Sequence, residues 1–152
     1  MPASMSGDEV LQWLTRNGWS PGRTVGETAR DFVSEVVAES EAEGFPAVPF
    51  GAALRFIATY GALELTHPND PESRLITNPT GGYEGDFGEI AELSRELGKR
   101  LFRIGYDLPD GGIFVVAEGG EFYCIHHTGA YFLGSDEFEF FSNWVRGDLQ
   151  SL

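Results

Sequence analysis

Four apolar segments decide the fold, and they follow one another in the stretch LFRIGYDLPDGGIFVVAEGGEFYCIHHTGAYFL, residues 101–133. Their bounds are Leu101–Ile104, Ile113–Ala117, Glu121–His126 and Ala130–Leu133. Each is short and rich in β-branched and aromatic residues, as strands are. Gly119-Gly120 suits a two-residue hairpin turn, because such turns need positive φ, and Thr128-Gly129 suits the next turn. The segments are continuously apolar, so we expect a sheet that is partly covered on both faces.

Three amphipathic helices are predicted before this sheet. The first runs from about Gly7 to Asn17, and the third starts near Pro49 and stops before Gly61. The second has the strongest pattern: Thr24 and Glu27 have the spacing of a capping box at its start, and a glycine ends it. The expected inward residues are Ala29, Phe32, Val33, Val36 and Val37 in the second helix and Phe50, Ala53, Leu54 and Ile57 in the third.

The period changes near residue 61, where short strands and loops begin. We expect strands at Ala62–Leu65 and Leu75–Thr77, separated by a loop at His67–Pro71. A second loop, Asn78–Gly85, leads to a helix over Glu89–Leu97. A last helix is predicted from Ser135 or Asp136 to Gly147, with Phe138, Phe141 and Val145 inward.

The length of 152 residues favours a single domain of mixed helix and strand. The pattern places the folded core at about residues 8–147 and leaves residues 1–7 and 148–152 as flexible ends. The sequence has 10 basic and 24 acidic residues, a formal net charge of −14. This charge disfavours nucleic acid and anionic membranes and favours a basic partner. The plainer alternative is general acidity, as in many soluble bacterial proteins.

Metal and catalytic sites are not predicted. Cys124 and His126 share one face of a strand and His127 follows, but a zinc site takes three or four ligands. No phosphate-binding glycine loop and no nucleophile motif is present, so we expect no cofactor and no catalytic residues. One cysteine allows no internal disulfide, and residues 1–8 do not resemble a secretory signal. These features predict a cytoplasmic protein.

Two acidic surfaces are candidates for partner binding. Glu84, Asp86 and Glu89 lie where a loop leads into a helix, and Tyr83 and Phe87 flank them. Loops often carry recognition, and aromatic residues anchor interfaces, although core packing explains Phe87 equally well. The alternative surface is formed by Glu27, Asp31 and Glu35, which recur every four residues on the second helix, opposite its apolar face. The plain interpretation of this row is a solvated helix face.

These motifs, in this order, resemble a known family. Gly18-Trp19-Ser20-Pro21-Gly22-Arg23-Thr24-Val25, directly after an amphipathic helix, resembles the opening signature of the third branch of the SUKH immunity proteins. Further matching segments are Phe45-Pro46, Ala53–Leu63, Leu97–Gly105, Gly120–Tyr123, Leu133-Gly134 and the closing helix to Gly147. The chain departs from the family at Ala62, where a second glycine is common, and at Ala117, where an acidic residue is common.

The resemblance implies an α+β fold in which helices pack on a curved, largely antiparallel sheet. It implies a bacterial immunity protein that neutralises a secreted polymorphic toxin, often a nuclease, by binding it directly. The residues Gly18, Trp19, Pro21, Gly22 and Arg23 are then expected to be structural, and Trp19 to pack on the first helices. Two alternatives remain: an interaction or scaffolding module of the same fold without a toxin partner, and a small-ligand binder or enzyme, which a buried pocket with convergent polar groups would favour.

Overall fold

The computed structural model describes residues 5–152 as one open antiparallel sheet and five helices. The strands pair in chain order, and their bounds are β1 Glu64–His67, β2 Asp70–Ile76, β3 Leu101–Leu108, β4 Ile113–Ala117, β5 Phe122–His126, β6 Gly129–Gly134 and β7 Gln150–Ser151. The helices are α1 Gly7–Arg16, α2 Gly26–Ala42, α3 Gly51–Tyr60, α4 Asp86–Leu97 and α5 Glu137–Arg146. The structure confirms the expected α+β fold class.

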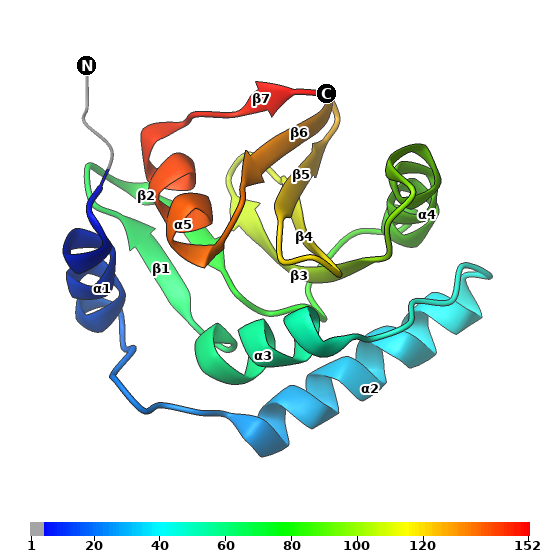
Figure 1. Cartoon of the computed structure of the whole chain (residues 1–152), viewed down its shortest axis with the longest axis horizontal. Coiled ribbons are helices and arrows are strands. Elements are labelled where there is room, and N and C mark those ends of the chain that lie inside the picture. Colours follow the sequence, from blue (N-terminus) through cyan, green and yellow to red (C-terminus); the bar gives the residue numbers. More distant parts are fainter. Residues whose placement is uncertain (1–4) are drawn as a thin grey trace.

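The sheet is curved, and the helices surround it (Figure 1). α2 lies beside α3, which packs against β3 and β4. α5 packs against β6 and also contacts α1, whereas α4 lies next to β3 at the other end of the molecule. The strands between Leu101 and Gly134 are therefore held between helices from both halves of the chain.

Aromatic rings from α3, α5 and the sheet meet in the core. The ring of Phe56 in α3 lies 5.3 Å from that of Phe122 in β5 and 6.0 Å from that of Phe141 in α5, measured between centroids. Phe140 stacks on Phe122 at 4.6 Å. Aromatic pairs at these separations contribute about 0.5–1.5 kcal/mol beyond the burial of their area. These contacts fix α3 and α5 on the same face of the sheet.

Trp13 joins the first helix to the last helix and to the edge of the sheet. Its buried ring lies 6.0 Å from Phe141 and 6.0 Å from Trp144, both in α5. Its Nε1 donates to the carbonyl of Thr66 in β1 at 2.8 Å, and the amide of Thr66 donates to Oδ1 of Asn17 at 3.1 Å. α1 thus occupies backbone groups on the outer edge of β1, which would otherwise be open to pairing with another strand.

The strands differ from the sequence expectation at three places. β1 and β2 form one hairpin that includes most of the expected loop His67–Pro71, because β2 begins with exposed polar residues that give no strand pattern. β3 continues past Ile104 to Leu108, and Gly105 permits this because a Cβ there would lie 2.3 Å from the carbonyl oxygen of Ile76. Residues 150 and 151, expected to be flexible, pair with Tyr131 and Phe132 as β7.

The N-terminal end is also anchored where it is described. The amide of Met5 donates to Oγ of Ser142 at 3.1 Å, and Ser6 and Glu9 form a capping box for α1. Residues 5–7 of the expected flexible end therefore make defined contacts, and residues 1–4 lie outside the described part of the chain.

The helices also differ in detail. The predicted capping box of Thr24 and Glu27 is wrong: α2 starts at Gly26 without a side-chain cap, and the amide of Val25 donates to the carbonyl of Ala58 at 2.9 Å. α4 starts at Asp86, earlier than expected. The inward faces shift, because α3 and α5 are apolar on several sides. In α3, Leu54 is exposed and Phe56 is buried in its place. In α5, Phe140 and Trp144 are buried, whereas Phe138 and Val145 are only half-buried.

Candidate partner-binding surfaces

The segment from Tyr83 to Glu89 is divided between surface and core. Tyr83, Glu84 and Glu89 are exposed, and we call these three residues the loop surface. Asp86 is only 5% exposed and Phe87 is buried, so the prediction that they contact a partner from the surface is wrong. The physical reason is that Asp86 opens α4 and turns inward, where its Oδ2 accepts the amide of Tyr83 at 2.7 Å.

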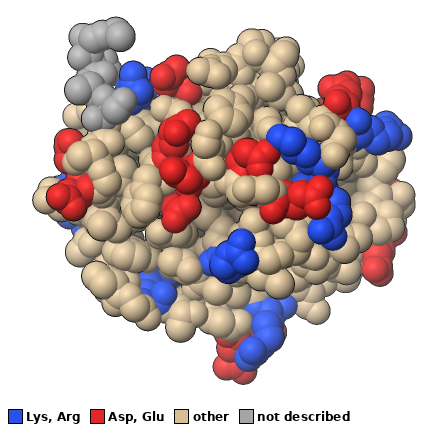
Figure 2. Space-filling view, in the orientation of Figure 1, with Lys and Arg blue, Asp and Glu red and all other residues tan. Residues whose placement is uncertain are grey.

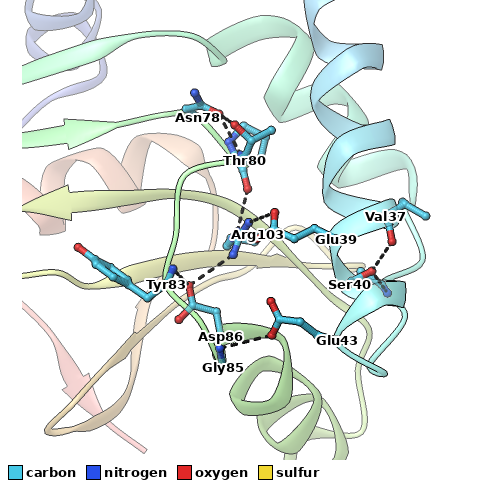
Figure 3. Close-up of polar contacts among 12 residues, drawn as sticks. Val37, Glu39, Ser40, Glu43, Asn78, Thr80, Tyr83, Gly85, Asp86 and Arg103 are labelled. Atoms are coloured by element: carbon cyan, nitrogen blue, oxygen red, sulfur yellow. Dashed lines mark hydrogen bonds and ion pairs between the residues drawn. The ribbon is translucent and has the colours of Figure 1, made fainter.

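A buried arginine explains this inward turn (Figure 3). Arg103 in β3 is 1% exposed, and its Nη1 lies 3.4 Å from Oδ2 of Asp86. Its Nη2 lies 3.2 Å from Oε2 of Glu39 in α2, and its Nε donates to the carbonyl of Pro79 at 2.8 Å. The guanidinium carbon lies 4.5 Å from the centroid of the Phe87 ring. One cation therefore holds α2, α4 and the loop between β2 and α4 together.

Burial raises the pKa of Asp86, and the Tyr83 amide and the Arg103 guanidinium oppose that rise. A buried ion pair with several hydrogen bonds is a positioning device, because it fixes the neighbouring segments in one arrangement. The sequence did not single out Arg103. The available signal was an arginine within an otherwise apolar strand, since arginine is almost never buried without a partner.

The alternative acidic surface lies on α2, the long helix beside α3 (Figure 1). Glu27, Asp31 and Glu35 are all exposed, and we call them the α2 row. Glu39 continues the same spacing but is half-buried and pairs with Arg103, so it is not part of the row. On the face shown in Figure 2, acidic and basic side chains are interspersed. The negative charge is therefore not gathered into one patch on that face.

The signature turn anchors the chain between α1 and α2 to the end of α3. The ring of Trp19 stacks on Tyr60 at 5.9 Å, and its Nε1 donates to the carbonyl of Thr59 at 3.1 Å. Arg23 donates to the same carbonyl at 3.3 Å and to that of Gly61 at 2.9 Å. Gly18 and Gly22 have φ of +102° and +80°, which favour glycine, and Pro21 lies exposed between them. These contacts are internal to the fold.

A cavity of about 670 Å³ opens beside α5, and we call it the α5 cavity. The sheet supplies most of its wall, through the β1–β2 hairpin, the end of β3 and strands β4 to β6. Its titratable and aromatic lining residues are His67, Asp70, Asp107, Asp110, Phe114, Cys124, His126, Tyr131 and Trp144. The sequence did not predict this cavity, because its residues come from six segments of the chain.

Asp107 is the most buried acid of the α5 cavity. It is 9% exposed; its Oδ1 accepts the amide of Gly112 at 2.7 Å and its Oδ2 accepts Nε1 of Trp144 at 3.0 Å. Burial raises its pKa, and these two donors oppose the rise. Among residues 5–152, no lysine or arginine forms an ion pair with it. The signal in the sequence was an aspartate inside an apolar strand.

The predicted absence of a metal concerned Cys124, His126 and His127. Cys124 and His126 line the α5 cavity, whereas His127 is exposed and lies outside it. Within residues 5–152 no group of three or more histidine, cysteine, aspartate or glutamate side chains is placed to hold a metal ion. Burial raises the pKa of Cys124 to about 12, and the charges of Asp107 and Asp110 add to this. The thiol is therefore protonated at neutral pH.

Together, the open antiparallel sheet, the anchored turn before α2 and the acidic outer surfaces define a small α+β domain. The chain belongs to the SUKH-3 immunity protein family, because the model of that family matches residues 6–147. Membership suggests a toxin immunity function, generally a non-enzymatic one, and implies a toxin as partner. Neither the curated proteins nor the solved structures contain a match to the chain. Over residues 5–152, none of the helices has the length and apolarity needed to cross a membrane.

Proposed function

We propose that this chain is an immunity protein that neutralises a secreted bacterial polymorphic toxin, a nuclease, by direct stoichiometric binding in the cytoplasm. The observation that carries the proposal is the match to the SUKH-3 immunity protein family over residues 6–147. Inhibition by binding needs neither a cofactor nor a catalytic group, in agreement with the sequence motifs.

Charge supports a nuclease as the partner. A protein that binds phosphates is basic, whereas this chain carries a formal net charge of −14. Complementary charge steers two proteins together and raises the association rate more than it raises the affinity. The loop surface is the first candidate for the contact, because Tyr83 adds an exposed ring beside Glu84 and Glu89. The α2 row is the second.

The proposal is tested by copurifying the chain with the product of a neighbouring toxin gene. We expect an equimolar complex by light scattering and loss of the toxin's nuclease activity within that complex. If the chain instead binds a host protein and leaves the toxin active, the proposal is wrong. A scaffolding module of the same fold would then be the better description.

Association kinetics identify the surface. Two variants with the same change in net charge are compared: Glu84→Lys with Glu89→Lys on the loop surface, and Glu27→Lys with Glu35→Lys on the α2 row. Asp86 is left unchanged because it is buried. Screening shortens the Debye length from about 10 Å at 0.1 M salt to about 3 Å at 1 M. Reversal at the true contact should therefore slow association most at low salt. If neither pair slows association, steering by these two acidic surfaces is wrong and contacts from the sheet side are favoured.

The α5 cavity favours a second candidate function, the binding of a free small ligand. Its volume of about 670 Å³ lies within the range of small-molecule sites, about 300–1,000 Å³, and it contains convergent polar groups. Binding of a metabolite by the isolated chain, with no effect of the toxin, would support this candidate.

A further inference from the structure

We propose that the α5 cavity receives an arginine side chain of the toxin; this inference rests on the proposed function and names the contact that completes it. The α5 cavity differs from both acidic surfaces. It is a concave site on the sheet side of α5, and none of the residues of the loop surface or the α2 row line it.

The first argument is the carboxylate of Asp107. It is nine-tenths buried and has two hydrogen-bond donors but no lysine or arginine partner within the described chain. Each carboxylate oxygen has two acceptor sites, so Oδ1 and Oδ2 each have capacity for another donor. Leaving a charge buried without a countercharge is costly, and such groups are concentrated at functional sites. A cation entering the cavity would supply the missing countercharge.

The second argument is that the lining adds further carboxylates and no lysine or arginine. Asp70 and Asp110 line the same cavity, and the structure records no ion pair between either of them and a described lysine or arginine. Two histidines also line the cavity, and hydrogen bonds to backbone groups fix their rings. Nε2 of His67 lies 2.7 Å from the carbonyl of Val145, and Nε2 of His126 lies 3.0 Å from that of Asp110.

A carbonyl oxygen only accepts, so each Nε2 carries a hydrogen. The amide of Asn69 donates to Nδ1 of His67 at 3.0 Å, and that of Thr128 donates to Nδ1 of His126 at 3.3 Å. Nδ1 of His126 also lies 2.9 Å from Oγ1 of Thr128, so both rings are held by hydrogen bonds within the chain. The cavity therefore offers three carboxylates and no lysine or arginine to a visiting group.

The third argument selects arginine among cations. The buried indole of Trp144 and the ring of Tyr131 line the cavity, and a planar guanidinium both stacks on aromatic rings and bonds a carboxylate with two donors. The lysine ammonium is a compact point charge, so it stacks on rings and binds both oxygens of a carboxylate less well than a guanidinium does. The volume of about 670 Å³ admits a long side chain together with water.

The first experiment needs no toxin. The isotope-labelled chain is titrated with N-acetyl-arginine amide, and in parallel with N-acetyl-citrulline amide, which has nearly the same shape but no charge. We expect saturable shifts of the Trp144 indole and Gly112 amide resonances with the arginine probe alone. Asp107→Asn should weaken this binding by about tenfold or more, since a charge-assisted hydrogen bond is lost. The matched control, Glu41→Gln, removes an exposed carboxylate from α2 that lines neither the cavity nor either acidic surface.

Asp110→Asn provides a second variant, because Asp110 is exposed and its replacement leaves the buried groups of the cavity in place. It should weaken binding in the same direction as Asp107→Asn. The inference is overturned if the arginine probe gives no saturable shift, if the citrulline probe shifts the same resonances equally, or if neither variant weakens binding.

The second experiment uses the toxin complex. Asp107→Asn should raise the dissociation rate by about tenfold or more, while Glu41→Gln leaves it unchanged. If the complex forms and inhibits but neither cavity variant alters dissociation, the inference fails and the proposed function stands. If the arginine probe binds but no toxin does, the proposed function fails and the named occupant is wrong. The cavity is then a site for a free cationic ligand.

Discussion

Replacing Arg103 with methionine should destabilise the protein strongly, because the change removes the cation that pairs with the buried carboxylate of Asp86. The Asp86 side chain is 6% exposed, and Arg103 is its ion-pair partner within the described residues. Breaking a buried pair by removing one member costs about 3–5 kcal/mol. The Glu39 side chain contacts the same guanidinium but is 40% exposed, and a solvent-screened pair contributes about 0–1 kcal/mol.

Urea unfolding at neutral pH, followed by circular dichroism, measures these values as free energies of unfolding. Arg103→Met should lower the free energy by about 3–5 kcal/mol, and Glu39→Gln, which touches the same cation, by less than about 1 kcal/mol. Adding Asp86→Asn to Arg103→Met should recover part of the loss, since the orphaned charge is removed while an acceptor for the Tyr83 amide remains. A loss below about 1 kcal/mol for Arg103→Met would refute the view that this cation fixes α2, α4 and the loop.

Three further outcomes are expected. Trp19→Ala should lower the unfolding free energy by about 1–3 kcal/mol in urea titrations, because the ring stacks on Tyr60 and donates one hydrogen bond. The loss is smaller than for a fully buried aromatic because the ring is half-buried, and an unchanged midpoint would assign Trp19 to binding. Burial raises the pKa of Asp107 above its ordinary 3.8, so the folded state keeps that proton to higher pH. The ionised carboxylate therefore lowers the free energy of unfolding, by the full amount above the raised pKa and not at all below 3.8. The stability of the wild type relative to Asp107→Asn should therefore increase as pH falls from 7 to about 4, and a pH-independent difference between paired titrations would contradict this. Cys124, with a pKa of about 12 against an ordinary 9.0, should have about a thousandfold less thiolate at pH 8 and react with iodoacetamide only as fast as the fold opens; rapid labelling of the folded protein would show otherwise.

The elements that the sequence predicted well are those whose apolar pattern matches their burial. Ile113–Ala117 is a strand buried throughout, and its bounds agree with the expectation. The start of β2 was missed, because Asp70 and its neighbours are exposed and polar where β2 extends beyond its pairing with β3, which begins at Arg74. The capping prediction at Thr24 failed for a similar reason: a tertiary backbone contact to Ala58 replaced a local side-chain cap.

The candidate sites were predictable only as far as exposure follows from polarity. That rule places Glu27, Glu84 and Glu89 correctly at the surface but fails for Asp86, whose burial depends on a cation seventeen positions further along the chain. Trp144 of α5 donates a hydrogen bond to Asp107 of β3, thirty-seven positions earlier, and no spacing in the sequence predicts this contact. Pairings of this kind are properties of the fold and require the structure.

The contact of Trp13 with α5 affects how the protein is made. Chains fold from the N-terminus as they are synthesised, at about 5–20 residues per second. α1 appears first, yet the partners of Trp13 are Phe141 and Trp144, near the end of the 152-residue chain. The packing of α1 against α5 can therefore form only after α5 has been synthesised, and Trp13 lacks its ring contacts while the intervening strands emerge. While the segment that contains α5 is still inside the ribosome, Trp13 lacks the rings of Phe141 and Trp144, and the contact between the first and last helices has not formed.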